Sequence, residues 1–440
     1  MKTISTLITI LLLFFQSIQT INAGQNPCNC LIPIDTTFSI VPFDGSGGSG
    51  GPGVAPEYRN DDWSSAAVVL PFNLCMYGNT YNTIYINNNG SISFGAAYST
   101  FTSTFFPTSA YSLLSPFWAD VDTRDPGSGL VYYKINPTSL IVIWDGVGYF
   151  NTHSDLRNRF QLVITDGSDP LVTQGNISFC YGDMQWTTGD ASSGLNGFGG
   201  TPAVAGINPG NGSDYVQLGT FDSPGNLYDG PGGLNDGVDW LDYAHFIIDA
   251  CPVNVPPVSL DCRNDTITMH VGDSALMQHQ FIAPEVNQSM TVNFQHSLTN
   301  FTTLSTTGND YLTVVTRLIA DAANIGYNTL TVTATDNGSP QGVTTYSRVI
   351  QILPFTGIDV PERDIIRIFP NPMSEQASIE TMLEGSCHLK LLDLAGRIIR
   401  SEEVNAKHID LRRDGLSEGS YLIVITTPDG REFCERLTVR

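Results

Sequence analysis

Short stretches in which apolar and polar residues alternate, separated by turn residues, run through most of this chain. In residues 83–94 two such stretches flank Asn89-Gly90, a pair that favours positive φ, so a β-hairpin is predicted there. No amphipathic helix of ordinary length is evident. The sequence therefore predicts an all-β protein made of several antiparallel β-domains in series. Three more hairpins are predicted, with arms at residues 130–135 and 140–145, 159–165 and 175–181, and 329–335 and 343–353.

The charge balance restricts the partners of the chain. Its 440 residues include 43 acidic and 20 basic side chains, which gives a formal net charge of −23 at pH 7. Nucleic-acid binding depends on Lys and Arg that neutralise phosphates, so we expect no nucleic-acid partner. The same acidic excess disfavours docking on an anionic membrane surface. Hydrophobic residues make up 41% of the chain, which is enough for several packed cores.

The N-terminus has the pattern of a secretory signal peptide. Lys2 supplies a short positive end, residues 8–15 form a continuous apolar run, and Ala23 ends a small-residue cleavage site. The alternative is a membrane-anchoring helix, but this run is too short to span about 30 Å of hydrocarbon comfortably. We therefore expect residues 1–23 to be a signal peptide, no transmembrane segment, and an exported protein.

Eight cysteines fit an oxidising destination. No two are spaced as Cys-x-x-Cys, so a zinc ribbon or a thioredoxin-like motif is not expected. Cys387 and Cys434 stand alone in the C-terminal region and most simply pair with each other. The other six allow many connectivities, among which the sequence does not choose. We expect Cys75 to form a disulfide with Cys180.

Composition divides the mature chain into three parts. Residues 24–251 are strongly acidic, whereas residues 355–440 are nearly balanced in charge and rich in Arg. The proline pair Pro256-Pro257 marks a stiff linker near one boundary, and Pro354 marks the other. The predicted domains after the signal peptide are therefore residues 24–251, 252–354 and 355–440.

The motifs of the first part resemble a known extracellular module. Residues 115–124 read Ser-Pro-Phe-Trp-Ala-Asp-Val-Asp-Thr-Arg and lead into a Tyr-containing strand at residues 129–133. A Trp-containing strand at residues 140–144 and an Arg-Phe-Gln strand from Arg159 follow in order. This order resembles the NIDO domain of nidogen, alpha-tectorin and some mucins, over roughly residues 77–249. The resemblance implies extracellular adhesion or matrix-type binding, and it brings no catalytic residues.

Carboxylates in the same stretch form a candidate cation site. Asp120 and Asp122 are two residues apart, so in a strand both would project from one face, and Asp125 follows in the turn. Clustered carboxylates bind hard cations such as Ca²⁺, the one cofactor that this sequence suggests. Asp120, Asp122 and Asp125 are therefore the candidate metal ligands. The alternative is that they cap the strand end and bind Arg124 or backbone amides.

Other acidic and aromatic residues of the first part are candidate binding elements. The Gly-rich segment 229–242 carries several Asp residues but lacks the spacing of an EF-hand loop, so a solvated acidic loop is favoured. Trp186 and Trp240 lie in polar, Gly-rich surroundings and are candidates for exposed binding aromatics. Trp118 and Trp144 lie on apolar runs and are expected in the core.

The middle part predicts one β-sandwich. Residues 326–340 resemble the penultimate strand and turn of cadherin-like or immunoglobulin-like bacterial surface modules. In that resemblance Asp336 matches a cadherin-type calcium ligand, but the other ligand motifs are missing. Asp-Asn-Gly-Ser-Pro forms a turn on its own, so Asp336 is expected to be a turn residue.

The C-terminal part carries the strongest resemblance. A Phe-Pro-Asn-Pro entry, an Asp-x-x-Gly-Arg turn, a Gly-x-Tyr strand and a short basic-ended strand occur there in order. This order resembles the type A sorting domain of the type IX secretion system of Bacteroidota, which implies a β-sandwich recognised by the type IX secretion machinery. The alternative is a β-sandwich with no address function. The motif residues are Pro370, Asn371, Pro372, Gly396, Arg397, Gly419 and Tyr421.

These features favour a secreted or cell-surface, non-catalytic adhesion protein with an extracellular protein or polysaccharide as its ligand. One alternative is a secreted carbohydrate-active or other hydrolase with an unidentified carboxylate pair, since such pairs catalyse glycoside hydrolysis. Another is a self-associating surface-layer component.

Overall fold

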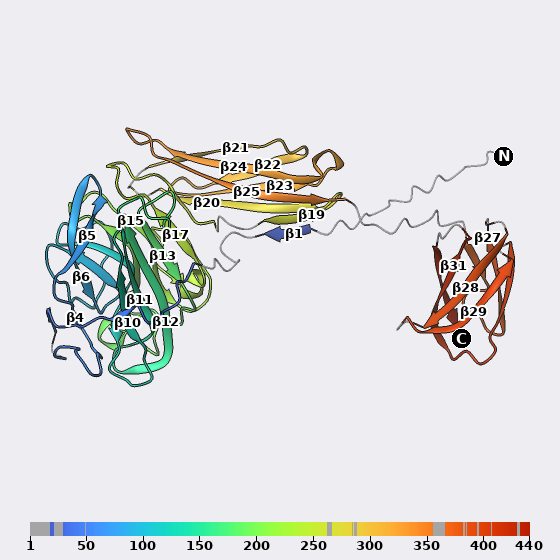
Figure 1. Ribbon diagram of the computed structural model, residues 1–440, viewed down its shortest axis with the longest axis horizontal. Coiled ribbons are helices and arrows are strands. Elements are labelled where there is room, and N and C mark those ends of the chain that lie inside the picture. The colour runs from blue at the N-terminus through green and yellow to red at the C-terminus, as the bar shows by residue number, and fades with distance from the viewer. Residues whose placement is uncertain are drawn as a thin grey trace, which may run out of the picture. The chain divides into compact units, whose positions relative to one another are not determined.

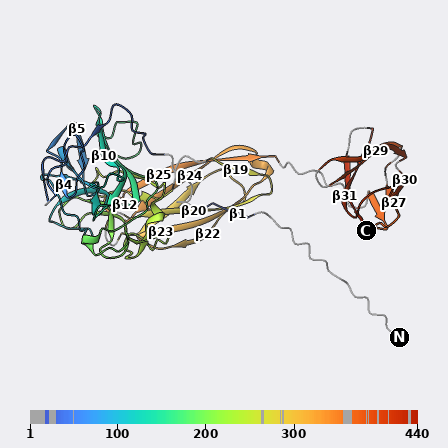
Figure 2. The same cartoon turned by 90° about the horizontal axis from the view of Figure 1, so that it is seen from below.

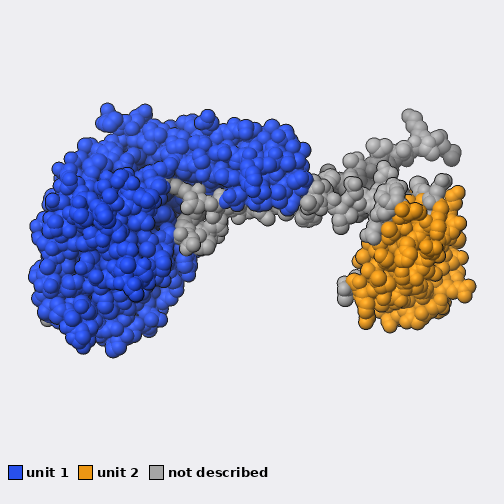
Figure 3. All heavy atoms as spheres, viewed as in Figure 1, with its two compact units in different colours: residues 1–354 blue, residues 355–440 orange. Residues whose placement is uncertain are grey.

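The structure, a computed structural model, is almost entirely β. It describes residues 18–21, 30–48, 50–261, 266–283, 285, 288–354, 366–381, 383, 385–393, 396–405, 407–428 and 432–440. In these residues no helix is long and apolar enough to cross a membrane. The all-β prediction is confirmed. The chain divides into two compact units, residues 1–354 and 355–440 (Figure 3). The described residues include three short 3-10 helices, η1 (Asp190–Ser192), η2 (Val238–Leu241) and η3 (Ala322–Asn324).

Two large sheets form the first part of unit 1 (Figure 1). One has the order β17-β13-β12-β11-β10-β2 with β9 paired to β11, and the other β16-β15-β14-β8-β7-β6-β4-β3 with β5 paired to β6. The strands of the first are β2 (Ser39–Ile40), β9 (Val121–Asp122), β10 (Leu130–Ile135), β11 (Ser139–Tyr149), β12 (His153–Thr165), β13 (Ile177–Tyr181) and β17 (His245–Ile248). Those of the second are β3 (Ser46–Gly47), β4 (Trp63–Ser64), β5 (Val68–Met76), β6 (Asn79–Asn87), β7 (Ser91–Phe94), β8 (Ser112–Trp118), β14 (Ala203–Asn208), β15 (Val216–Ser223) and β16 (Asp236–Gly237).

All four predicted hairpins are present. In the first, Tyr85 pairs with Ser93 and the turn residue Gly90 has a φ of 77°. A Cβ at Gly90 would lie 1.8 Å from the carbonyl oxygen of Phe117, so this turn requires Gly. The other three are β10 with β11, β12 with β13, and β24 (Gly326–Asp336) with β25 (Val343–Leu353).

Both large sheets contribute to one apolar core. Trp144 stacks on Phe160 with ring centroids 5.0 Å apart, and Phe117 contacts Phe160 from the other sheet. Trp118 is equally buried, in a smaller cluster with Phe106. The predicted core positions of Trp118 and Trp144 are confirmed.

Unit 1 also contains a second sandwich (Figure 2), which has its own core. Its strand orders are β1-β20-β23-β22, with β18 paired to β20, and β19-β25-β24-β21. Of the predicted signal peptide, only β1 lies in the described residues, and it runs parallel to β20. Besides β24 and β25, the strands are β1 (Ile18–Ile21), β18 (Val258–Ser259), β19 (Ile267–His270), β20 (Ser274–Ile282), β21 (Met290–Gln295), β22 (Phe301–Thr307) and β23 (Tyr311–Ile319).

Unit 2 is a small sandwich around a third core. A three-stranded sheet has the order β26-β27-β30, and a four-stranded sheet has the order β29-β28-β31-β32. The strands are β26 (Ile366–Phe369), β27 (Gln376–Thr381), β28 (Ser386–Asp393), β29 (Ile398–Asn405), β30 (His408–Arg412), β31 (Gly419–Thr426) and β32 (Glu432–Val439).

Candidate functional site

Three carboxylates meet where the segment before β4 crosses the bend between β8 and β9. Asp61, Asp62 and Asp120 each offer an oxygen, and these oxygens all lie within 4.8 Å of one another. An antiparallel bridge between Asp61 and Asp122 joins the two segments. Thr123 reinforces this bridge, because its amide donates to the carbonyl of Asn60 at 2.9 Å. We call Asp61, Asp62 and Asp120 the acidic cluster.

Burial dominates the electrostatics of the acidic cluster. Asp61 is 4% exposed and Asp120 is 2% exposed. Burial, with repulsion from Asp62 and other neighbouring carboxylates, raises the pKa of Asp61 to about 7 and that of Asp120 to about 8. Asp62 is half-buried, and its Oδ1 accepts a hydrogen bond from Asn89 Nδ2 at 2.8 Å.

Arg124 neutralises the carboxylate beside the acidic cluster. Its Nε donates to Asp122 Oδ1 at 2.9 Å, and its terminal nitrogen lies 2.6 Å from Asp122 Oδ2 and 3.0 Å from Asp61 Oδ2. Asp122 also accepts the backbone amides of Arg124 and Thr152, each at 2.9 Å. Asp122 is therefore fully engaged in hydrogen bonds and ion pairing.

Of the predicted ligand set Asp120, Asp122 and Asp125, the acidic cluster contains only Asp120. Asp120 lies in the bend between β8 and β9, so it does not share a strand face with Asp122. Asp125 Oδ1 accepts from the amide of Gly127 and the hydroxyl of Ser154, both at 2.7 Å. The alternative from the sequence, in which these carboxylates bind Arg124 or backbone amides, is correct for Asp122 and Asp125. Asp61 and Asp62 were missed because only the fold brings them to Asp120.

The predicted binding tryptophans are packed rather than exposed. Trp186 is 0% exposed, and its indole N–H donates to the carbonyl of Val147 at 3.0 Å, so its prediction as a surface aromatic is wrong. Its ring packs against Phe117 and Tyr149 in the main core. Trp240 is half-buried and stacks on Tyr228 with ring centroids 3.6 Å apart. One face of Trp240 is therefore already occupied.

The acidic segment 229–242 is only partly solvated, because Asp229 and Asp239 are exposed while Asp236 and Asp242 accept backbone amides. Asp236 is 0% exposed, and its two oxygens accept the backbone amides of Thr220 at 3.0 Å and Asp229 at 3.1 Å. Asp242 Oδ1 accepts the amide of Met184 at 2.9 Å. Burial raises the pKa of Asp236 to about 7. These carboxylates hold loops, which the sequence pattern alone did not indicate.

Asp336 has the turn role that the sequence predicts. Its Oδ1 accepts the amides of Gly338 and Gly342, each at 2.9 Å, and Asn254 donates to both of its oxygens. Asp336 therefore closes the hairpin turn and also holds the segment that leads into the second sandwich.

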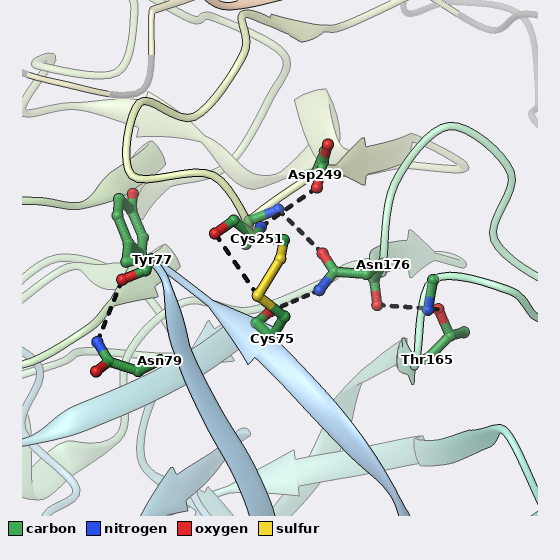
Figure 4. Close-up of a disulfide and its surroundings, with 9 residues drawn as sticks. Cys75, Tyr77, Asn79, Thr165, Asn176, Asp249 and Cys251 are labelled. Carbon is green, nitrogen blue, oxygen red and sulfur yellow. Dashed lines mark hydrogen bonds between the residues drawn. A yellow bond between two sulfur atoms is a disulfide. The ribbon is translucent and has the colours of Figure 1, made fainter. Parts of the chain in front are cut away.

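A disulfide braces the end of the first sandwich (Figure 4). Cys75 pairs with Cys251, and Asn176 donates to the carbonyl of Cys75 at 2.6 Å. Cys180 pairs with Cys30, so the predicted Cys75–Cys180 bridge is wrong. The reason is topological, since Cys180 lies on β13 beside β17, while Cys75 lies on β5 of the other sheet.

The predicted Cys387–Cys434 bridge is also absent. Cys387 forms no disulfide and is buried in the core of unit 2. β31 lies between β28 and β32, and Cys434 aligns through Val424 with Lys390 rather than with Cys387. Cys434 is also exposed, while Cys387 points inward. Two strand spacings, about 10 Å, exceed the reach of a disulfide.

The sorting-motif residues fasten the last strand of unit 2. Asn371 donates from Nδ2 to the carbonyl of Arg436 at 2.7 Å and accepts the amide of Thr438 at 2.9 Å. Gly396 has a φ of 81° in the turn where Arg397 pairs with Asp393 at 3.0 Å. Of the other motif positions, Pro370 and Pro372 flank Asn371, and Gly419 is the first residue of β31. The hydroxyl of Tyr421 donates to the carbonyl of Ser417 at 2.9 Å.

Comparisons with known proteins match two regions of the chain. Residues 44–220 match the family described as NIDO related, and residues 367–440 match the family described as secretion system C-terminal sorting domain. Alpha-tectorin of Mus musculus is 34% identical over 190 residues, which cover 36% of this chain and 8% of alpha-tectorin. Nidogen of Drosophila melanogaster is 27% identical over 144 residues, covering 26% of this chain and 10% of nidogen.

Two further similarities complete the comparison. Dendrite extension defective protein 1 of Caenorhabditis elegans is 27% identical over 183 residues, covering 35% of this chain and 14% of that protein. Among solved structures, the N-terminal Ig1-2 module of the Drosophila receptor protein tyrosine phosphatase DLAR aligns with a TM-score of 0.17 and 10% identity, over 42% of this chain and 99% of that module. This chain thus spans a small part of the curated relatives it matches.

Proposed function

We propose that this chain, which joins a NIDO-related domain to a type IX sorting tail, is a non-catalytic adhesion protein of a member of Bacteroidota. The sorting tail directs it to the type IX secretion machinery, and thereby to the outer cell surface or the medium. The observation that supports adhesion is the pairing of this export address with a domain similar to alpha-tectorin and nidogen.

The three predicted domains take separate roles in this proposal. Residues 24–251 bind an extracellular protein or polysaccharide, residues 252–354 hold that domain away from its attachment point, and residues 355–440 are the address. The core of the second sandwich, formed by residues 267–352, supports a middle domain, although Val255, Val258, Leu260 and Ile282 pack into the core of the first sandwich. The division of the chain after Pro354 supports the other boundary.

The placement of the buried acids supports a binding role over hydrolysis. Asp122, Asp236 and Asp242 accept backbone amides or pair with Arg124, so they serve the fold. A glycosidase needs two carboxyl groups that face each other across a substrate cleft. We therefore favour adhesion, and retain a secreted hydrolase as the alternative that experiment must exclude.

Attachment of whole cells tests the proposal. Cells of the native bacterium that lack the protein are compared with cells that produce the full chain, on surfaces coated with extracellular proteins or polysaccharides. We expect the producing cells to attach in larger numbers to at least one coating, and the protein to be found outside the outer membrane. Equal attachment on every coating would contradict the proposal. Shortened polysaccharide or cleaved ester in the medium would favour the hydrolase.

A further inference from the structure

We propose that the acidic cluster of Asp61, Asp62 and Asp120 is a binding site for a hard divalent cation, with Ca²⁺ as its ligand. The distances between the carboxylates fit one ion. Their oxygens lie within 4.8 Å of one another, and two oxygens on opposite sides of a Ca²⁺ ion are separated by about 5 Å. A single ion can therefore contact all three side chains without a rearrangement of the backbone.

Two buried oxygens lack any partner, which is the independent sign of a missing ligand. Asp120 Oδ2 and Asp61 Oδ1 are inaccessible to solvent and accept no hydrogen bond from the described residues. Buried polar atoms in native proteins are nearly always paired, and exceptions call for an explanation such as a bound ion. Both side chains are more than nine-tenths buried, so solvent does not satisfy these oxygens.

The charge count leaves room for a divalent cation. Four carboxylates lie together here, the acidic cluster and Asp122, and Arg124 is the cation paired with them. Arg124 is held by Asp122 and by Asp61 Oδ2, so it does not pair with the free oxygen of Asp61 or with Asp120. The donors are all carboxylate oxygens, which are the ligands that Ca²⁺ prefers. Zinc is typically bound by nitrogen and sulfur ligands.

Backbone packed against the carboxylates restricts the site to something small. A Cβ at Gly189 would lie 2.7 Å from Asp120 Oδ2, and a Cβ at Gly48 would lie 3.0 Å from Asp62 Oδ2. The indole N–H of Trp63 donates to the carbonyl of Gly48 at 2.9 Å, which holds that loop over the carboxylates. An ion fits this enclosure, whereas a side chain at either glycine would collide with a carboxylate.

Terbium luminescence and calorimetry on the full chain test this site. Tb³⁺ occupies Ca²⁺ sites, and Trp63, next to Asp62 in the chain, can transfer excitation energy to it. We expect saturable Tb³⁺ emission that Ca²⁺ displaces, and a calorimetric Ca²⁺ isotherm with one site. D120N and D62N should each weaken Ca²⁺ binding at least tenfold. D125N, which alters a carboxylate outside the acidic cluster, should stay within about twofold of the wild type.

The outcomes separate clearly. An absence of saturable Ca²⁺ binding by the wild type overturns the proposal, and so does unchanged affinity in both D120N and D62N. Loss of binding in D125N alone would also overturn it, in favour of a different ligand set. Asn has the shape of Asp, so D120N is expected to fold. If it does not, D62N decides, because Asp62 is only half-buried. No arm of the experiment depends on adhesion.

Discussion

Buried carboxylates that accept backbone amides are a recurrent device in unit 1. Glu285 is a partly buried example, since its Oε1 accepts the amide of Val255 at 2.8 Å and so holds the segment that leads into the second sandwich. Burial, with repulsion from Asp336 and Asp214, raises the pKa of Glu285 to about 7. The folded protein therefore keeps a proton on this group at a pH where the unfolded chain has released it.

The raised pKa of Glu285 predicts a pH-dependent stability. Between about pH 4.5 and 7 the folded state binds more protons than the unfolded state, so the contribution of Glu285 to the free energy of unfolding falls as pH rises. We expect E285Q to flatten the decline of unfolding free energy between pH 5 and pH 8, measured by urea unfolding. E57Q, at an exposed position, is the control. Parallel curves for the wild type and E285Q would refute this role.

At the scale of elements, strand order decides the chemistry of the cysteines. In unit 2, β31 separates β28 from β32, which keeps Cys387 and Cys434 apart. We expect alkylation of the native protein to modify the exposed Cys434 and to reach the buried Cys387 only after denaturation. Peptide mapping without reduction should recover the Cys30–Cys180 and Cys75–Cys251 pairs. A peptide that links Cys387 to Cys434 would contradict this strand order.

The last strand of unit 2 depends on the segment between β26 and β27. Asn371 bonds the backbone of β32 at two positions, and the amide of Met373 donates to the carbonyl of Thr438 at 2.7 Å. We expect N371A to lower the unfolding free energy of unit 2 by about 1–2 kcal/mol, the contribution of two partly exposed hydrogen bonds. S374A, with an exposed side chain, is the matched control in denaturant unfolding. Equal midpoints for the two variants would argue against this tie.

The strands and turns could be predicted from local sequence signals, whereas contacts between distant parts of the chain could not. Asn89-Gly90 favours a tight turn by its own backbone preferences, so the hairpin of β6 and β7 can be predicted from the sequence. Asp61 gives no sign that it will meet Asp120, because a bridge between distant segments joins them. Trp186 was misplaced for a related reason, since polar neighbours in sequence do not show that its ring packs into the core.

At the scale of the whole molecule, the chain combines an export address with similarity to extracellular proteins. The C-terminal tail accounts for where the protein goes, and the NIDO-related region is the part to which we assign binding. The acids of that region are largely committed to the fold, with the acidic cluster as the place left for an ion. An adhesive role therefore predicts binding that leaves the bound ligand chemically intact.

Binding of the purified full chain to immobilised extracellular proteins and polysaccharides, with the mass of each ligand recorded before and after, tests this account most directly. We predict saturable binding to at least one ligand, displaced by soluble full chain, with no change in the ligand's mass. Absence of saturable binding across the panel, or a ligand that becomes shorter on contact, would contradict the account.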